Sequence, residues 1–169
     1  MDTGPSEPES RMPRALLPLL RLALAVAVLL PVPPSGQPAV AAEVTVTMVT
    51  DGPGGRFRFE PAIVRIRPGD TVRFVAHDPI HATKSIPGMM PAGAAPWWGE
   101  MGKPLEVTFT VPGIYGFKCP SHYTVGMVGL IIVGDSAPNL EEARALRHPR
   151  MAQEAFDRLF ADLAATDRR

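Results

Sequence analysis

The sequence is poor in cysteine and histidine. Its 169 residues include one cysteine, Cys119, and four histidines. A single cysteine excludes an internal disulfide bond. It also excludes covalent haem attachment, which requires Cys-x-x-Cys-His, and four Cys or His ligands for zinc are hard to assemble from this set.

Lysine is scarce too, with three residues in the chain: Lys84, Lys103 and Lys118. The 17 basic and 17 acidic side chains give a formal net charge of zero. No block of Lys and Arg is long enough to follow a phosphate backbone, so the composition does not support nucleic-acid binding. The length favours one domain with an appendage.

Long apolar runs are also missing. Basic residues precede the run LALAVAVLL, which is too short for a membrane span of about 20 residues. The small residues PAVAA follow, an order typical of an export signal cleaved after Ala41 or Ala42. We expect residues 1–42 to be a signal peptide, with Met12 as an alternative start and an uncleaved N-terminal anchor as the alternative reading.

Short alternating segments, separated by turn residues, fill the next part of the chain. In VRIRPGDTVRFV, apolar residues alternate with arginines on either side of the turn Pro68-Gly69-Asp70. Seven or eight such strands, with no helical period among them, predict an all-β fold, a β-sandwich over residues 43–135. A longer loop, residues 87–104, contains Trp97 and Trp98, of which we expect one to be buried and one half exposed.

The pattern becomes helical after the last strand. Asn139 is placed to cap a helix, with Glu142 three residues later as in a capping box, and Pro149 separates this helix from the next. The predicted helices cover 139–147 and 149–165. We expect residues 136–169 to form a C-terminal helical extension packed on the sandwich, with a dimer interface as the alternative.

The segment CPSHYTVGM carries the chemistry, because it places His122 and Met127 close after Cys119. A thiolate, two imidazoles and a weak axial thioether are the donors of an electron-transfer copper site. The second imidazole must come from His81 or His77, which both follow the strand TVRFVA. Half a zinc site and a cysteine–histidine nucleophile are the alternatives that spacing leaves open. The remaining histidine, at position 148, is expected at a helix end.

Several longer segments resemble the pseudoazurin family of type 1 blue-copper cupredoxins. They are MVTDGPGGRFRFEPAIVRIRPGDTVRFV, IPGMMPAGA, VTFTVPGIYGFKCPSHYTVGMVGLIIVGD and NLEEARALRHP. The resemblance runs from about Met48 to Leu163. It implies a Greek-key cupredoxin sandwich with one copper ion cycling between Cu(I) and Cu(II), and a periplasmic location. The copper ligands that it implies are His81, Cys119, His122 and Met127, with no catalytic residues.

Two positions depart from the family pattern next to the implied ligands. Ala82 stands where the family has asparagine, and Pro120 directly follows the cysteine, where the family has threonine or serine. Ser121 returns a backbone N–H one position later, close to the expected thiolate. Hydrogen bonds around such a sulfur tune the reduction potential. We therefore expect a shifted potential and a looser ligand loop.

The resemblance also implies that electrons pass through His122, near the surface. The docking rim expected around it consists of Ile80, Lys84, Met89, Met90 and Pro120. The implied partners dock transiently: a donor such as a cytochrome and an acceptor such as a copper or haem reductase, for example nitrite reductase. We expect a monomer.

Two other functions compete with electron carriage. A periplasmic copper-binding or delivery protein would use methionines, of which Met89, Met90, Met101 and Met127 are available. An oxidase or reductase would need further histidines for a second, catalytic copper ion. The chain has none to supply, so we expect it not to be an enzyme.

Overall fold

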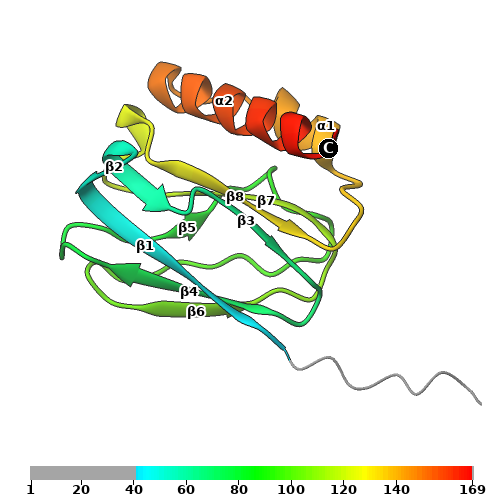
Figure 1. Ribbon diagram of the computed structural model, residues 1–169, viewed down its shortest axis with the longest axis horizontal. Coiled ribbons are helices and arrows are strands. Elements are labelled where there is room, and N and C mark those ends of the chain that lie inside the picture. Colours follow the sequence, from blue (N-terminus) through cyan, green and yellow to red (C-terminus); the bar gives the residue numbers. More distant parts are fainter. Residues whose placement is uncertain (1–40, 169) are drawn as a thin grey trace, which may run out of the picture. The chain divides into compact units, whose positions relative to one another are not determined.

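The computed structural model describes residues 41–168, which form a two-sheet sandwich with helices against one sheet (Figure 1). The strands are β1 (Glu43–Gly52), β2 (Gly55–Glu60), β3 (Ile63–Ile66), β4 (Thr71–Ala76), β5 (Lys84–Ser85), β6 (Leu105–Thr108), β7 (Gly113–Lys118) and β8 (Val128–Val133). A 3₁₀ turn, η1 (Tyr123–Val125), and two helices, α1 (Leu140–Ala145) and α2 (Arg150–Thr166), complete the fold. Residues 1–40 of the predicted signal peptide lie outside the described residues. Among those described, no helix has the length and apolar character of a membrane span.

The eight strands form two four-stranded sheets, which confirms the predicted β-sandwich. One sheet has the order β2-β1-β4-β6 and the other β3-β8-β7-β5. The turn at Pro68-Gly69-Asp70 does not make a hairpin, because β3 pairs with β8 and β4 pairs with β1 and β6. The turn thus carries the chain from one sheet to the other. The Asp70 carboxylate fixes it by accepting hydrogen bonds from the backbone N–H groups of Ala42 and Arg67.

The inner faces of both sheets are built by period-two alternation. Val64, Val72 and Phe74 are at most 3% exposed, whereas Arg65 and Arg73 between them are exposed. Because successive side chains of a strand point to opposite faces, the arginines mark the solvated side, as predicted. Burial of each large apolar side chain contributes roughly 1.5–3 kcal/mol to the sandwich.

The central strands of the second sheet, β7 and β8, are buried on both faces, because the helical extension covers their outer side (Figure 1). All six residues of β8 are buried. The outer cluster joins that strand to the apolar stripe of α2, namely Ala152, Phe156, Leu159, Phe160 and Leu163. The helices therefore pack on the second sheet within the chain.

The N-termini of the two helices differ from the prediction. Asn139 lies at the N-cap of α1, but its side chain makes no capping hydrogen bond. Its Oδ1 accepts from the Ile114 N–H at 2.9 Å, and its Nδ2 donates to the Ile114 carbonyl at 2.8 Å. The buried backbone of β7 needs those partners more than the exposed helix end does. Pro149 precedes α2 at the N-cap rather than in its first turn.

The long loop, residues 87–104, packs along the chain that follows β4. Trp97 is 8% exposed and Trp98 is 68% exposed, which confirms the expectation of one buried ring. The N–H of Gly102 donates to the His81 carbonyl at 2.8 Å, and that of Gly99 donates to Thr83 at 2.8 Å. The loop therefore fixes the backbone of a predicted donor residue.

Candidate metal centre

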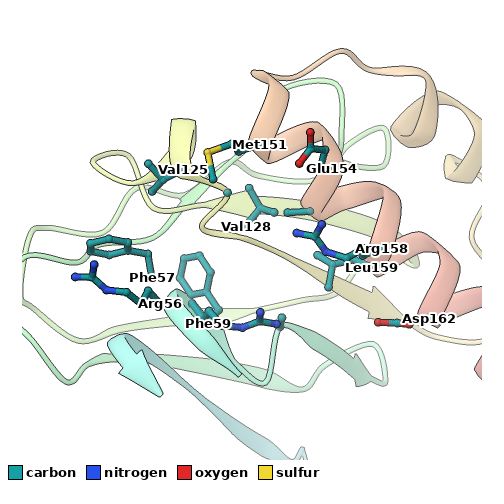
Figure 2. A pocket seen from close by; sticks show the side chains of 14 residues that line it. Arg56, Phe57, Phe59, Val125, Val128, Met151, Glu154, Arg158, Leu159 and Asp162 are labelled. Atoms are coloured by element: carbon teal, nitrogen blue, oxygen red, sulfur yellow. The ribbon is translucent and has the colours of Figure 1, made fainter. Parts of the chain in front are cut away.

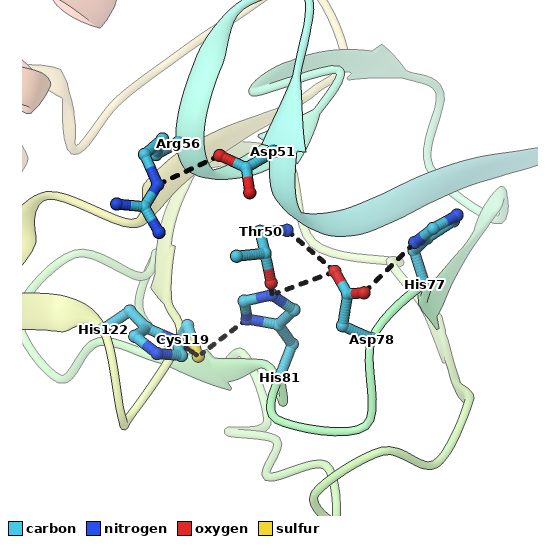
Figure 3. Close-up of polar contacts among 8 residues, drawn as sticks. All are labelled: Thr50, Asp51, Arg56, His77, Asp78, His81, Cys119 and His122. Carbon is cyan, nitrogen blue, oxygen red and sulfur yellow. Dashed lines mark hydrogen bonds and ion pairs between the residues drawn. The ribbon is translucent and has the colours of Figure 1, made fainter.

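Three of the predicted donors meet at one end of the sandwich (Figure 3). The donor atoms of His81, Cys119 and His122 all lie within 4.8 Å of one another. The Cys119 Sγ lies 3.9 Å from His81 Nδ1 and 3.5 Å from His122 Nδ1. Donors bound at about 2.0–2.3 Å to one ion and spread about 120° apart lie roughly 3.5–4 Å from each other. The arrangement therefore fits a single metal ion.

The loop between β7 and β8 supplies most of the set. The Cys119 N–H donates to the Met127 carbonyl at 3.0 Å, and the Met127 N–H donates to the His122 carbonyl at 3.1 Å. These bonds close the loop and bring both ends together. The side chains of Cys119 and Met127 are fully buried in the same inner cluster. Two sulfurs and two imidazoles, with soft thiolate and thioether character, suit copper.

His81 is held from behind by a polar chain. Its side chain is fully buried, and Nε2 lies 3.1 Å from the Thr50 hydroxyl. The Asp78 carboxylate accepts a hydrogen bond from the backbone N–H of Thr50 at 2.9 Å and lies 3.8 Å from His81 Nε2. A carboxylate on this side of the ring favours the proton on Nε2, so the Nε2–H donates to the Thr50 hydroxyl oxygen. That tautomer leaves the Nδ1 lone pair directed at the sulfur, where a metal would bind.

Both imidazoles are neutral at neutral pH, because their surroundings lower their pKa values. Burial lowers the pKa of His81 first, and the neighbouring His122 lowers it further, although Asp78 acts in the opposite direction. Burial lowers the pKa of His122. Hydrogen bonds from Thr50 lower the pKa of Asp78, so this group remains a carboxylate. A neutral imidazole is the form that ligates a metal.

One residue near the site was not predicted. The ring of Phe57 stacks on that of His122, with centroids 4.4 Å apart and planes at 15°. The Arg56 guanidinium lies 5.0 Å from the centre of the Phe57 ring and pairs with Asp51 at 3.0 Å. Phe57 has a φ of 51°, a conformation that costs a non-glycine residue about 1 kcal/mol. Phe57 and Phe59 are two positions apart in the same strand, which indicates that both side chains face inward. No sequence pattern indicates that Phe57 stacks on His122.

The other two histidines lie outside the donor set. His77 is exposed, and its Nδ1 lies 3.4 Å from Asp78, on the side away from the sulfur (Figure 3). Of the two candidates for the second imidazole, the structure thus selects His81. His148 lies between α1 and α2, as expected for a helix-end residue, with its Nδ1 2.7 Å from the Tyr123 hydroxyl.

The predicted docking rim is partly wrong. Met89 is fully buried in the outer cluster against the helices, so it cannot contact a partner. Met90 is half-buried and packs against the inner cluster. Ile80 is 46% exposed, and Pro120 is also exposed. Lys84 places its ammonium 3.5 Å from the centre of the Trp98 ring.

The residues that depart from the family pattern are split between interior and surface. Ala82 is 2% exposed, whereas Pro120 and Ser121 are exposed. The buried position next to His81 therefore carries a side chain without hydrogen-bonding groups. The effect of these residues on the potential and on the looseness of the loop remains a prediction.

A His–Cys–His set beside a methionine, at one end of an eight-stranded sandwich, defines a type 1 copper protein of the cupredoxin class. A family model described as copper binding proteins of the plastocyanin/azurin family matches residues 46–134. The chain belongs to this family and, within it, to the pseudoazurins. Pseudoazurins carry electrons and are not enzymes, which confirms that expectation.

The similarity extends over nearly the whole chain. Pseudoazurin from Methylorubrum extorquens is 43% identical over 150 residues, which are 89% of this chain and 97% of the relative. Pseudoazurin from Paracoccus pantotrophus is 39% identical, covering 80% and 92%. The crystal structure of pseudoazurin from Methylobacterium extorquens AM1 superposes with a TM-score of 0.69 at 44% identity, covering 72% of this chain and 98% of that chain. Copper as the cofactor and the cupredoxin fold are both confirmed.

Proposed function

We propose that the protein carries single electrons between periplasmic redox proteins on one copper ion held by His81, Cys119, His122 and Met127. The observation that carries this proposal is the convergence of three donors within 4.8 Å. Copper supplies the one-electron chemistry when bound. The donors come from two chain segments that are each tied to the sandwich, so the protein imposes one geometry on both oxidation states.

The buried half of the site keeps that geometry fixed. Thr50 and Asp78 orient His81 from behind, and the backbone N–H of Gly102 holds its carbonyl. Cys119 is fully buried, which excludes water from the thiolate and protects it from oxidation. A site that needs little rearrangement exchanges electrons quickly.

His122 is the proposed point of electron entry and exit. Its ring is half-buried. The proposed docking face includes two exposed apolar residues close to ligands in the sequence: Pro120, two residues before His122, and Ile80, which directly precedes His81. A small apolar contact suits brief encounters with a partner. The proposed partners are redox proteins: a donor such as a cytochrome and an acceptor such as a copper or haem reductase, for example nitrite reductase.

The proposed organisation of the chain follows from this role. Residues 1–42 act as a cleaved export signal, residues 43–135 form the copper-binding sandwich, and residues 136–169 form the helical extension. The mature protein acts in the periplasm as a monomer. A copper delivery protein is the alternative, but a complete His–Cys–His set favours a site that also holds Cu(II).

The test is to add one equivalent of Cu(II) to residues 43–169 and to record visible and electron paramagnetic resonance spectra. We expect an intense thiolate-to-copper band and reversible one-electron cycling. Cys119→Ser should abolish the band, whereas the matched control His77→Ala should keep it, because His77 lies outside the donor set. Binding of Cu(I) alone, or Cu(II) binding that does not need Cys119, would favour delivery instead.

A further inference from the structure

The C-terminal extension touches the ligand loop at the segment between two proposed ligands. That segment, residues 123–126, separates His122 from Met127 and contains η1. Figure 2 shows Met151 of α2 beside Val125 at the end of a groove of about 250 Å³ that β2, η1 and α2 line. The extension lies outside residues 46–134, where the copper-binding family model matches.

The first contact is a hydrogen bond between Tyr123 and His148. The Tyr123 hydroxyl lies 2.7 Å from His148 Nδ1. Tyr123 directly follows His122 in the chain, so this bond fixes the residue next to a proposed ligand. The Lys118 ammonium lies 4.0 Å from the centre of the Tyr123 ring and holds the ring from another side.

His148 is itself held rigidly. Its backbone N–H donates to the Gln153 side chain at 3.2 Å, and its ring packs on that of Phe156 with centroids 4.5 Å apart. The ring's other nitrogen, Nε2, is buried and has no hydrogen-bond partner among residues 41–168. A buried unpaired nitrogen costs free energy that an apolar side chain would not. The bond to Tyr123 is therefore the polar contact that orients this imidazole.

The second contact lies at the other end of the segment. Gly126 has a φ of 93°, and a Cβ at this position would lie 3.1 Å from the Met151 carbonyl oxygen and 3.6 Å from the Ala155 Cβ. The first turns of α2 thus press directly on the residue before Met127. Glycine is required there both by the left-handed backbone and by the close approach of the helix.

We propose that the C-terminal extension clamps the ligand loop, and that His148 is a positioning residue that acts on His122 through Tyr123. The contacts at residues 123 and 126 fix the spacing between two copper ligands from outside the sandwich. The inference rests on the proposed function in that it takes His122 and Met127 as ligands. The contacts themselves exist without the metal, so they can be tested without it.

The first experiment measures hydrogen exchange in the metal-free protein. The amides of Val125 and Gly126 are hydrogen-bonded within the loop and report on its opening. We expect Tyr123→Phe and His148→Leu each to speed their exchange about tenfold, and the double variant to add little more. His148→Asn, which keeps a polar group near Nδ1, should recover much of the protection.

A matched control separates clamping from general loosening of the extension. Leu163→Ala removes a buried side chain from the far part of α2, which faces the outer cluster and not the loop. We expect it to speed exchange in α2 but not at residues 125 and 126. Unchanged loop exchange in both clamp variants, or an equal effect of Leu163→Ala, would overturn the clamp.

The second experiment repeats the series with Cu(II) bound. We expect Tyr123→Phe and His148→Leu to shift the thiolate-to-copper band and to speed copper loss to a chelator about tenfold, with His148→Asn close to the wild type. Absence of Cu(II) binding by the wild type would refute the proposed function. The hydrogen-exchange results in the metal-free protein would still test the clamp. Normal copper binding with no change in any variant would refute the clamp alone.

Discussion

The two imidazoles of the site are held in opposite ways. His81 is fully buried, its Nε2 is bonded to Thr50, and its backbone carbonyl is bonded to Gly102. His122 is half-buried, and its ring is held by stacking on Phe57 and by the loop that carries it. His81 is therefore fixed by hydrogen bonds in the interior, and His122 by ring stacking near the surface.

This difference separates the two demands on an electron carrier. The interior ligand keeps the geometry constant, which polar bonds of defined length and direction do best. In the proposed function the surface ligand passes electrons and lies close to a partner, where water would compete with its hydrogen bonds. Ring stacking holds the plane of His122 without that competition. Removing or weakening each support should therefore give different results.

The largest effect should come from deleting each imidazole in turn. His81→Gly leaves a cavity in the interior and should lower the free energy of unfolding by about 3 kcal/mol. His122→Gly opens a position near the surface, so added imidazole should refill it and restore the thiolate-to-copper band. The measurements are chemical denaturation and a visible titration with imidazole.

The two glycine variants serve as controls for each other. Imidazole should not restore the band in His81→Gly, because the position of the His81 side chain is closed to solvent. Equal rescue of both variants, or of neither, would contradict the proposed division between interior and surface ligands.

Thr50→Val should give the next largest effect. The change keeps the shape of the side chain but leaves the buried His81 Nε2–H without an acceptor, which should cost about 1–3 kcal/mol. We expect a lower denaturation midpoint and a broader spread of copper geometries in the electron paramagnetic resonance spectrum. Thr45→Val, at an exposed position of the same strand, should change neither. A midpoint unchanged by Thr50→Val would show that the polar chain does not support His81.

The sequence predicts the interior of the sandwich and its buried ligands well. Period-two alternation located the buried faces of the strands, because a strand in a sandwich has one apolar side. Donor chemistry around Cys119 favoured copper, although it left a zinc site and a cysteine–histidine nucleophile open, and it narrowed the second imidazole to two histidines. The choice between His77 and His81 came from the family resemblance, since only a folded chain shows which side chain turns inward.

The contacts around His122 and near the surface were much less predictable. The stack of Phe57 on His122 joins residues 65 positions apart, and no local pattern encodes such a contact. Met89 was placed on the rim because apolar loop residues were assumed to face a partner, but the helices cover it. Asn139 had the correct local signal for a helix cap, but its side chain is hydrogen-bonded to the backbone of Ile114 instead. In each case a tertiary contact overrode a local preference.

Phe57→Leu should have a smaller effect, on the potential more than on stability. Loss of the stack, worth about 0.5–1.5 kcal/mol, lets water reach the imidazole. Water favours the more highly charged Cu(II) state, so the reduction potential should fall by an amount on the order of tens of millivolts. Val125→Ala, an exposed change on the same groove, should leave the potential unchanged in cyclic voltammetry. A rise in potential for Phe57→Leu would contradict this account.

The smallest effect should be a pH dependence at the surface half, through His148. Burial lowers the pKa of His148 below its ordinary 6.5, and Lys118 on β7 adds to this, while Asp157 on α2 opposes it. As the pH falls below 6.5, the unfolded chain takes up a proton first, so the free energy of unfolding decreases until the folded pKa is passed. Above 6.5 this contribution is fully present.

The measurement compares urea midpoints of the metal-free wild type and His148→Asn at about pH 7.5 and about pH 5.5. The wild type should lose more stability over this interval, because only it carries the imidazole bonded to Tyr123. His81 and His122 have lowered pKa values as well, but they titrate in both proteins, so the difference reports His148. Equal losses would mean that His148 is protonated as easily in the fold as in water. The support of the surface ligand would then be insensitive to pH.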